Sequence, residues 1–249
     1  MLSEKVKYIL SRQLKFPQKS IEWLVARRNI ISSSEVSSVL ESNKYMSSLE
    51  LLQNKTSNII TEENNPAISW GIQFEPIAIS IYEKINNIKS NQCSLVLHEK
   101  YDWLGASPDG ILDNGKLLEI KCPFYGSISK IDIPSNYWVQ VQMQMECCDL
   151  EEADLMQCKF INYDEEPTNE FYGLLDNGKY WVLDDYIIHN IKRDRDWFSK
   201  NLYKLNDFWM DIKKYRESNI EIMNIPILED RANNLNTNNL NTNNLNTNN

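Results

Sequence analysis

Histidine is scarce in this chain of 249 residues, which contains only His98 and His189. A zinc site rich in histidine, or a nuclease mechanism that depends on histidine, would need more imidazoles than these. A Ser-His-Asp triad would have to use one of the two, and the sequence has no G-x-S-x-G motif. Any hydrolytic chemistry would therefore rest on carboxylates, lysine and a hard cation.

Further absences concern the cellular compartment. No apolar run approaches the roughly 20 residues that a membrane-spanning helix needs. The opening residues, MLSEKVKYILSRQLKF, are charged and lack the continuous apolar stretch of a secretory signal. The five cysteines are odd in number and include no C-x-x-C pair. We expect an intracellular protein without a signal peptide or transmembrane segment, whose cysteines are reduced and mostly buried.

Positive charge is also in deficit, because 26 lysines and arginines face 35 aspartates and glutamates, for a net charge of −9. Such a balance does not steer a protein toward phosphates at long range. A local basic groove or bound divalent cations can reverse the sign where it matters. The acidic total is therefore an objection to a nucleic-acid partner, but it does not exclude one.

The composition is otherwise that of a globular protein, with 42% hydrophobic and 10% aromatic residues. We expect one domain over residues 1–230. From Asn233 the sequence repeats NNLNT three times and closes with NN. This uncharged segment has too little apolar content to fold alone, so residues 231–249 are expected to form a disordered Asn-rich tail.

Apolar periodicity predicts several helices. Residues 70–87 give the clearest one, with large apolar side chains at helical spacing along one face. Pro76 fits a helix only in its first turn, so the regular helix is expected to begin near Glu75. The other helices are expected over residues 3–15, from Ile21, from Glu35, over 133–148 and over 186–217.

The middle of the chain reads as a sheet. Residues 113–115, Asp-Asn-Gly, supply the turn chemistry of a tight hairpin. Strands are expected over residues 93–98, 101–106, 109–112, 116–122 and 153–162, and around YGLL or YWVL. This order predicts an α/β protein of the α+β type, with a mixed central sheet flanked by helices.

The stretch KLLEIKCP, residues 116–123, places two charged residues inside a strand. Strand side chains alternate between faces, so Glu119 and Lys121 share one face while Leu118, Ile120 and Cys122 share the other. Taken alone, the pattern is better explained by an edge strand with an ordinary surface ion pair. The choice depends on what the rest of the chain brings to the same place.

The hairpin brings a second acid toward that strand. Asp109 lies in a Pro-Asp-Gly bend, and pairing through the turn places it near Glu119. Two converging carboxylates repel each other unless one is protonated or a metal is bound, and Mg²⁺ resolves this repulsion. Lys121 could then orient or deprotonate a water polarised by the metal. Asp109 alone could also be a simple turn residue.

Five ordered blocks resemble a known family. The spacing of Asp109, Glu119 and Lys121 resembles the active-site signature of the PD-(D/E)XK nuclease superfamily, which has a restriction-endonuclease-like core. Within it, the chain resembles the lambda-exonuclease/YqaJ-type viral recombinase nucleases over about residues 20–215. The matching blocks are WLVARRNIISSSEV, WGIQFEPIA, GASPDGIL, LLEIKCP and YWVQVQMQM.

The resemblance implies a metal site and a catalytic lysine. Glu75, Asp109, Glu119 and the backbone carbonyl of Ile120 would hold Mg²⁺ or Mn²⁺, and Lys121 would act on the attacking water. The functional role of Glu75 competes with a simpler one, because an acid near a helix N-terminus is favoured by the helix dipole.

The resemblance also implies a phosphate site. Arg27 and Ser34 would hold the 5′-terminal phosphate of DNA, although Arg28 could take the place of Arg27 and Ser34 could be only a helix cap. Gln140 would be a helper of the catalytic residues or would face the DNA. Gln140 and Gln144 lie four apart on one helix face and could instead be simply solvated.

The function implied by the resemblance is a metal-dependent DNA exonuclease that acts 5′-to-3′ on linear duplex DNA in recombination, repair or viral DNA processing. Its expected partners are duplex DNA ends, a single-strand annealing protein and further copies of the chain in a ring. The rivals are a RecB-like nuclease of other polarity, a non-catalytic DNA-end-binding protein on the same fold, and an inactive structural protein. Cleavage polarity, strand preference, processivity and oligomeric state do not follow from the sequence.

Overall fold

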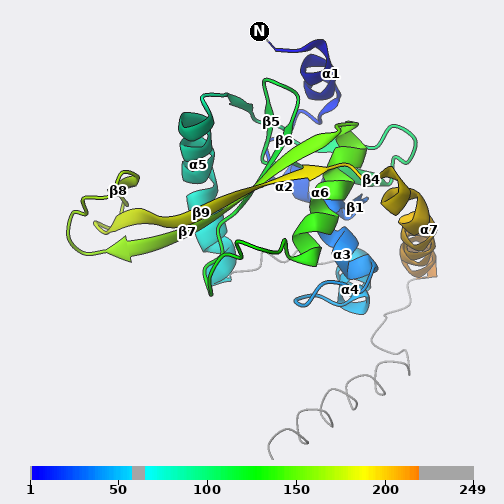
Figure 1. The fold of residues 1–249 in the computed structure, drawn as a ribbon. Helices are drawn as coiled ribbons and strands as arrows, with labels where there is room; N and C mark the ends of the chain where they lie inside the picture. Colours follow the sequence, from blue (N-terminus) through cyan, green and yellow to red (C-terminus); the bar gives the residue numbers. More distant parts are fainter. Residues whose placement is uncertain (1, 58–64, 219–249) are drawn as a thin grey trace, which may run out of the picture.

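A computed structural model describes residues 2–57 and 65–218 (Figure 1). The Asn-rich tail and the expected end of the domain near residue 230 lie outside these residues. The helices are α1 Glu4–Arg12, α2 Ile21–Arg28, a 3-10 turn Ser33–Glu35, α3 Val36–Val39, α4 Ser48–Thr56, α5 Pro66–Asn86, α6 Ser135–Cys148 and α7 Arg195–Ser218. The strands are β1 Ile31–Ser32, β2 Ser90–Asn91, β3 Val96–Leu97, β4 Leu104–Ala106, β5 Gly110–Leu112, β6 Leu117–Lys121, β7 Glu152–Tyr163, β8 Tyr172–Leu174 and β9 Tyr180–Lys192.

The larger sheet has six strands in the order β2-β5-β6-β7-β9-β8. The β6–β7 pair is parallel and the other pairs are antiparallel, so the expected mixed sheet is confirmed. The predicted hairpin is also present, because β5 pairs with β6 through Gly110 opposite Leu118. β6 lies between β5 and β7, so the interpretation of its charged pair as part of an edge strand is wrong.

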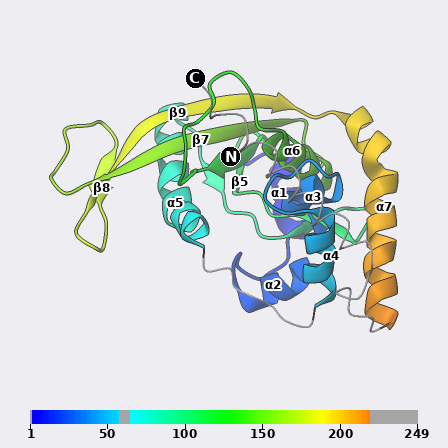
Figure 2. The ribbon, with the colours of Figure 1, turned by 90° about the horizontal axis from the view of Figure 1, so that it is seen from below.

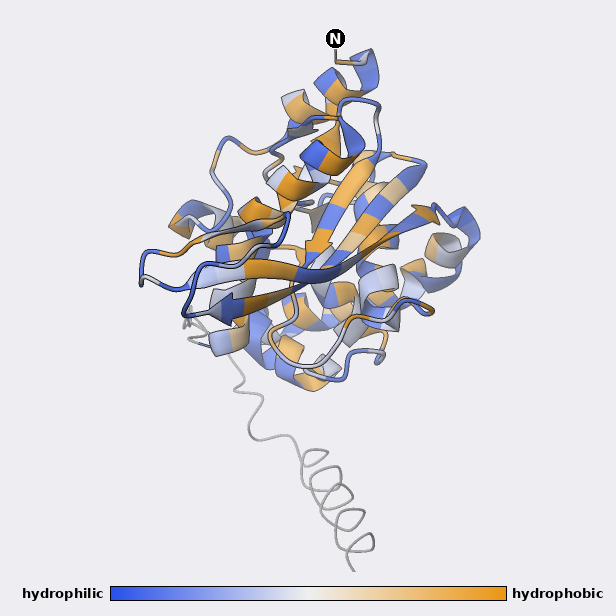
Figure 3. Cartoon of the chain, turned by 60° about the vertical axis from the view of Figure 1, so that its left-hand side comes forward, coloured by the Kyte–Doolittle hydropathy of each residue, from blue (hydrophilic) through white to orange (hydrophobic). Residues whose placement is uncertain are grey.

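Helices cover the two faces of this sheet. Leu118 and Ile120 of β6, and Cys122 just after it, pack with Phe74 of α5, in a cluster that also holds apolar residues of β7 and β9. Leu117, on the opposite face, packs in a second cluster with residues of α6. The strand alternation expected from the sequence is therefore observed, and Figure 3 shows hydrophobic and hydrophilic residues alternating along the strands. Glu119 and Lys121 consequently lie on the face toward α6.

A smaller sheet of order β1-β4-β3 stands beside the larger one. Its residues Ile31, Leu104 and Ala106 share a core with buried side chains of α3, α4, α6 and α7. α2, β1 and the 3-10 turn follow one another here, and the 3-10 turn Ser33–Glu35 lies against α6.

The helix α5 begins earlier than predicted. It starts at Pro66, where the Asn65 side chain accepts a hydrogen bond from the Ala67 N–H (2.9 Å), so Pro76 lies inside the helix rather than in its first turn. A proline inside a helix removes one backbone hydrogen bond. Buried contacts of Phe74 and Ala78, on either side of Pro76, offset that loss against the sheet.

The C-terminal helix begins later than predicted. Residues 186–192 belong to strand β9, and α7 starts only at Arg195. β9 pairs with β7 along its whole length, from Glu152 opposite Lys192 to Tyr163 opposite Tyr180. Ile191, expected on the helix, lies in the sheet core. The tertiary pairing of a segment rich in aromatic and β-branched residues overrides its apparent helical spacing.

The outer ends of β7 and β9, together with β8, form an arm that projects from the body of the protein (Figure 2). All five cysteines are buried and free of disulfides, as expected. In the ranges 2–57 and 65–218 no helix combines the length and apolar character that crossing a bilayer requires.

Candidate active site

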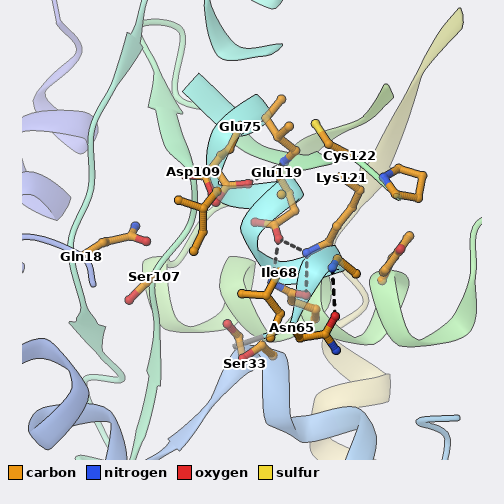
Figure 4. Close-up of a pocket in the computed structure, with 18 of the residues that line it drawn as sticks. Gln18, Ser33, Asn65, Ile68, Glu75, Ser107, Asp109, Glu119, Lys121 and Cys122 are labelled. Atoms are coloured by element: carbon orange, nitrogen blue, oxygen red, sulfur yellow. Dashed lines mark hydrogen bonds and ion pairs between the residues drawn. The ribbon is translucent and has the colours of Figure 1, made fainter. Parts of the chain in front are cut away.

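A cavity of about 590 Å³ opens where α2, α5, α6 and the end of β6 meet. All eight residues that the sequence proposed as functional line it: Arg27, Ser34, Glu75, Asp109, Glu119, Ile120, Lys121 and Gln140. They come from segments that span more than a hundred positions of the chain, and the fold brings them together. Figure 4 shows the three acids close to one another on one side of this cavity.

Glu119 is the most deeply buried of these acids, with only 2% of its side chain exposed. Its Oε1 accepts hydrogen bonds from the Lys121 Nζ and the Gln140 Nε2, both at 2.6 Å. The Gln140 Oε1 in turn accepts from the Lys121 Nζ at 3.0 Å. The three side chains thus form a closed triangle of hydrogen bonds, and the alternative that Gln140 is simply solvated is wrong.

From the sequence, Gln144 could be a solvated residue without a function, but the structure buries it completely. Its Nε2 donates to the Glu119 Oε2 at 2.7 Å. By contrast, Gln142 of the same block binds the Lys192 carbonyl (2.9 Å) and the Asp194 N–H (2.7 Å), away from the cavity. The i, i+4 spacing of Gln140 and Gln144 was the only sequence signal for the shared contact with Glu119.

Asp109 and Glu75 complete the acidic group. The Asp109 Oδ2 accepts from the Ile120 N–H at 2.7 Å, and the Glu75 Oε2 pairs with the Lys19 Nζ at 3.2 Å. Burial raises the pKa of Asp109 well above its usual range, and the negative charges of Glu119 and Glu75 raise it further. The carboxylates therefore crowd one another, as the sequence predicted for the hairpin.

The three acids of the cavity are donors of the type that a hard divalent cation takes. Among the described residues, no three acidic, histidine or cysteine side chains stand together as a ready-made metal site. Each of the three acids instead has a partner of its own. Glu75 pairs with Lys19, Asp109 accepts from the Ile120 N–H, and Glu119 accepts from Lys121. Carboxylate oxygens are the ligands that Mg²⁺ and Mn²⁺ take, and a cation between them relieves their repulsion.

Lys121 is a charged group in this environment. Burial disfavours its ammonium form, but the carboxylates of Glu119 and Asp109 outweigh that cost and raise the pKa of Lys121 above its ordinary value. The ring of Tyr137 lies 5.3 Å from the Lys121 Nζ and adds a cation–π contact. Lys121 consequently reaches the cavity as a fixed positive charge beside the acids.

A second polar group lies across the cavity. The Arg27 NH2 donates to the Ser34 Oγ at 2.8 Å and to the Ser32 Oγ at 2.9 Å, and its guanidinium stacks on Trp23 at 4.4 Å. Arg28 does not appear among the described residues that line the cavity, so the geometry favours Arg27 of the two candidates. Ser34 lies inside the 3-10 turn, whose N-cap is Ser32.

The support of this arginine was not predicted from the sequence. Lys55 of α4 donates to the carbonyls of Arg27 and Ile30, both at 2.7 Å, and pairs with the Glu35 Oε2 at 2.8 Å. Burial raises the pKa of Glu35, but the charges of Lys55 and Arg27 outweigh it and lower that pKa below its ordinary value. Glu35 also accepts from the Ser32 N–H at 2.8 Å. A buried charge pair therefore holds the backbone on both sides of the serines.

Two crystal structures share the fold of this chain. An alkaline exonuclease (LHK-Exo) from Laribacter hongkongensis matches with a TM-score of 0.62 at 23% identity, covering 87% of this chain and 100% of that one. A phage related exonuclease from Haemophilus somnus 129PT matches with a TM-score of 0.51 at 14% identity, covering 78% and 96%. The mixed sheet, its flanking helices and these matches define the class by its fold, a PD-(D/E)XK-like core.

Within this class, the chain belongs to the family of the YqaJ-like viral recombinase domain, which matches residues 22–151. Protein R354 of Acanthamoeba polyphaga mimivirus is 30% identical over 173 residues, which are 63% of this chain and 32% of that protein. Protein YqaJ of Bacillus subtilis is 30% identical over 127 residues, which are 49% of this chain and 40% of that protein. The matched segments thus span less than half of either relative.

Proposed function

We propose that this protein is a metal-dependent DNA exonuclease that hydrolyses phosphodiester bonds. The observation that supports this most directly is the single cavity in which Glu75, Asp109, Glu119 and Lys121 face the Arg27–Ser34 pair. The family and the fold of the alkaline exonuclease point to the same activity. The proposal concerns this chain and not the whole of the longer relatives, because the matched segments are only part of them.

In the proposed mechanism, Glu75, Asp109, Glu119 and the carbonyl of Ile120 hold Mg²⁺ or Mn²⁺. When bound, the cation polarises the attacking water and neutralises charge on the scissile phosphate and the leaving oxygen. Lys121 would orient that water from the side of Glu119, to which its Nζ is bonded. Gln140 is hydrogen-bonded to both Lys121 and Glu119 and would hold these two side chains in place.

The second polar group supports the polarity that we propose for the reaction. Arg27 and Ser34 would bind the 5′-terminal phosphate, since a planar guanidinium beside hydroxyl groups suits a phosphate well. The stacking on Trp23 orients the guanidinium before the substrate arrives. A strand anchored by its 5′ end in the same cavity would be cut from that end, which gives 5′-to-3′ digestion of linear duplex DNA in recombination, repair or viral DNA processing.

The first experiment is digestion of linear duplex DNA that is 5′-phosphorylated and end-labelled on either strand, with Mg²⁺ or Mn²⁺. We expect stepwise loss from the 5′ ends by the wild type and none by Lys121→Met, which keeps the apolar stem. Lys130→Met is the matched control, because the Lys130 side chain is 62% exposed and pairs with Asp185. Loss from the 3′ ends would contradict the polarity, and end binding without cleavage would favour the non-catalytic rival.

A second experiment separates the two arginines. Arg27→Ala should remove the preference for a 5′-phosphorylated over a 5′-hydroxyl end, whereas Arg28→Ala should retain it. Equal loss in both variants would mean that general positive charge, and not a phosphate site at Arg27, accounts for the preference.

The proposed partners would supply DNA affinity that an acidic chain lacks. A ring of copies around the duplex, or a single-strand annealing protein bound nearby, would keep the substrate close despite unfavourable long-range steering. Sedimentation of the protein with and without a duplex tests the ring, and a single mass equal to the monomer under both conditions would refute it.

A further inference from the structure

Gln144 differs from the other polar residues around Glu119 in one respect: it has no exposed surface. Lys121 and Gln140 line the cavity, but Gln144 does not, so it approaches Glu119 from the interior. A buried amide is unfavourable unless it is hydrogen-bonded. Its Nε2 has Glu119 as an acceptor, while its Oε1 is buried without a partner among the described residues.

The orientation of this amide is fixed by Glu119. If the amide were turned over, its oxygen would face the Glu119 Oε2, and two acceptors would repel each other. The observed orientation leaves the Gln144 Oε1 unpaired but gives its N–H a charged acceptor at 2.7 Å, which is the stronger type of hydrogen bond. Gln144 is therefore arranged to serve the carboxylate rather than its own oxygen.

The two oxygens of Glu119 consequently have different surroundings. The Oε1 meets Lys121 and Gln140, which line the cavity, and the Oε2 meets Gln144 in the interior. Gln140 and Gln144 are one helical turn apart on α6, so a single rigid helix holds both oxygens. The carboxylate cannot rotate about its terminal bond without breaking the contacts on both sides.

We propose that Gln144 is a positioning residue: by donating to the Glu119 Oε2, it holds the carboxylate in the orientation in which Glu119 would bind a divalent cation. This inference rests on the proposed function, because it takes Glu119 to be a metal ligand. An amide suits the position since it donates a hydrogen bond without adding charge. A carboxylate there would repel Glu119, and an ammonium group would neutralise the charge that attracts the cation.

The test is a calorimetric titration of the whole protein with Mn²⁺ in the absence of DNA, comparing the wild type with Gln144→Met. Methionine fills a similar volume but cannot donate a hydrogen bond. We expect Mn²⁺ affinity to fall about 10- to 100-fold, as is usual when a partner of a metal ligand is lost. Nuclease activity lost at low Mn²⁺ should return as the Mn²⁺ concentration is raised.

Gln142→Met is the matched control. Gln142 is also a buried glutamine of α6, but its amide binds the backbone of Lys192 and Asp194. Its loss should lower the free energy of unfolding without changing Mn²⁺ affinity. Gln144→Asn is a second variant in case the methionine does not fold, because its side chain is one methylene too short for the 2.7 Å contact.

The outcomes separate the inference from the proposed function. Mn²⁺ affinity within twofold of the wild type in a folded Gln144 variant would overturn the role of Gln144 and leave the nuclease proposal standing. An equal loss of affinity in Gln142→Met would also overturn it, since the effect would then be general. Failure of the wild type to bind Mn²⁺ would refute the role of Gln144 and the proposed metal site together.

Discussion

Lys55→Met should be one of the most damaging single substitutions outside the proposed catalytic residues. The Lys55 side chain is 4% exposed and its partner Glu35 is 18% exposed, so the pair is largely removed from water. The substitution leaves the Glu35 carboxylate without its cation and the carbonyls of Arg27 and Ile30 without their donor. Breaking a buried pair from one side costs about 3–5 kcal/mol.

Urea unfolding followed by tryptophan fluorescence measures this loss directly. Thermal unfolding gives a second measure. For a chain of this size each kcal/mol lowers the melting temperature by about 2–4 °C, so the melting temperature should fall by about 6–20 °C. Lys204→Met on the exposed side of α7 is the control and should change stability by less than about 0.5 kcal/mol. A loss below about 1 kcal/mol for Lys55→Met would refute the reasoning, because the three contacts would then not hold the structure.

The same variant tests whether structural support and phosphate binding are linked. Lys55 fixes the backbone at Arg27, and Glu35 fixes the N–H of Ser32, so both ends of the proposed phosphate site depend on this pair. At a temperature where the variant is folded, its preference for 5′-phosphorylated ends should fall. An unchanged preference would mean that Arg27 and Ser34 keep their geometry without this support.

Three further substitutions give sharp expectations. Asp109→Asn should make the metal-free protein more stable at pH 7, because burial and the acidic neighbours raise the pKa of Asp109, and should abolish thermal stabilisation by Mn²⁺. Glu35 has a lowered pKa in the folded protein, so its contribution to stability is present above its ordinary pKa of 4.5 and is lost as the pH falls through the folded value. In Glu35→Gln the free energy of unfolding should therefore depend less on pH in that range. Gly105→Ala would place a Cβ 2.6 Å from the Ile30 Cδ1 and should cost about 1–3 kcal/mol in urea unfolding, partly restored by Ile30→Val.

The hairpin and its charged strand could be predicted because their signals are local. The Asp-Asn-Gly turn determines which residues of β5 and β6 face each other, and strand alternation then determines that Glu119 and Lys121 share a face. Asp109 follows from the same register, since its carboxylate reaches the Ile120 N–H. Three residues of the candidate site were thus set by about a dozen consecutive positions.

The residues that support the proposed phosphate site could not be predicted, because they act through long-range contacts. Lys55 lies 28 positions from Arg27 and reaches its backbone carbonyl, which has no sequence signature. In α4, Lys55 looks like any lysine in the last turn of a helix. The predicted starts of α5 and α7 were wrong for a related reason. The packing around Pro76 in α5, and the pairing of β9 with β7 before α7, depend on partners far along the chain.

The distribution of charge answers the objection that an acidic chain makes against a DNA partner. Residues 163–186, the acidic arm, contain seven acidic side chains and one lysine, which is two thirds of the net charge of −9. The arm projects from the body (Figure 2), and none of its described residues lines the cavity. Charges separated by more than about 8–10 Å of solvent are largely screened at physiological salt. Arg27 and Lys121 line the cavity itself, so the charge there differs from the total of the chain, and a bound divalent cation would offset the repulsion of the local acids.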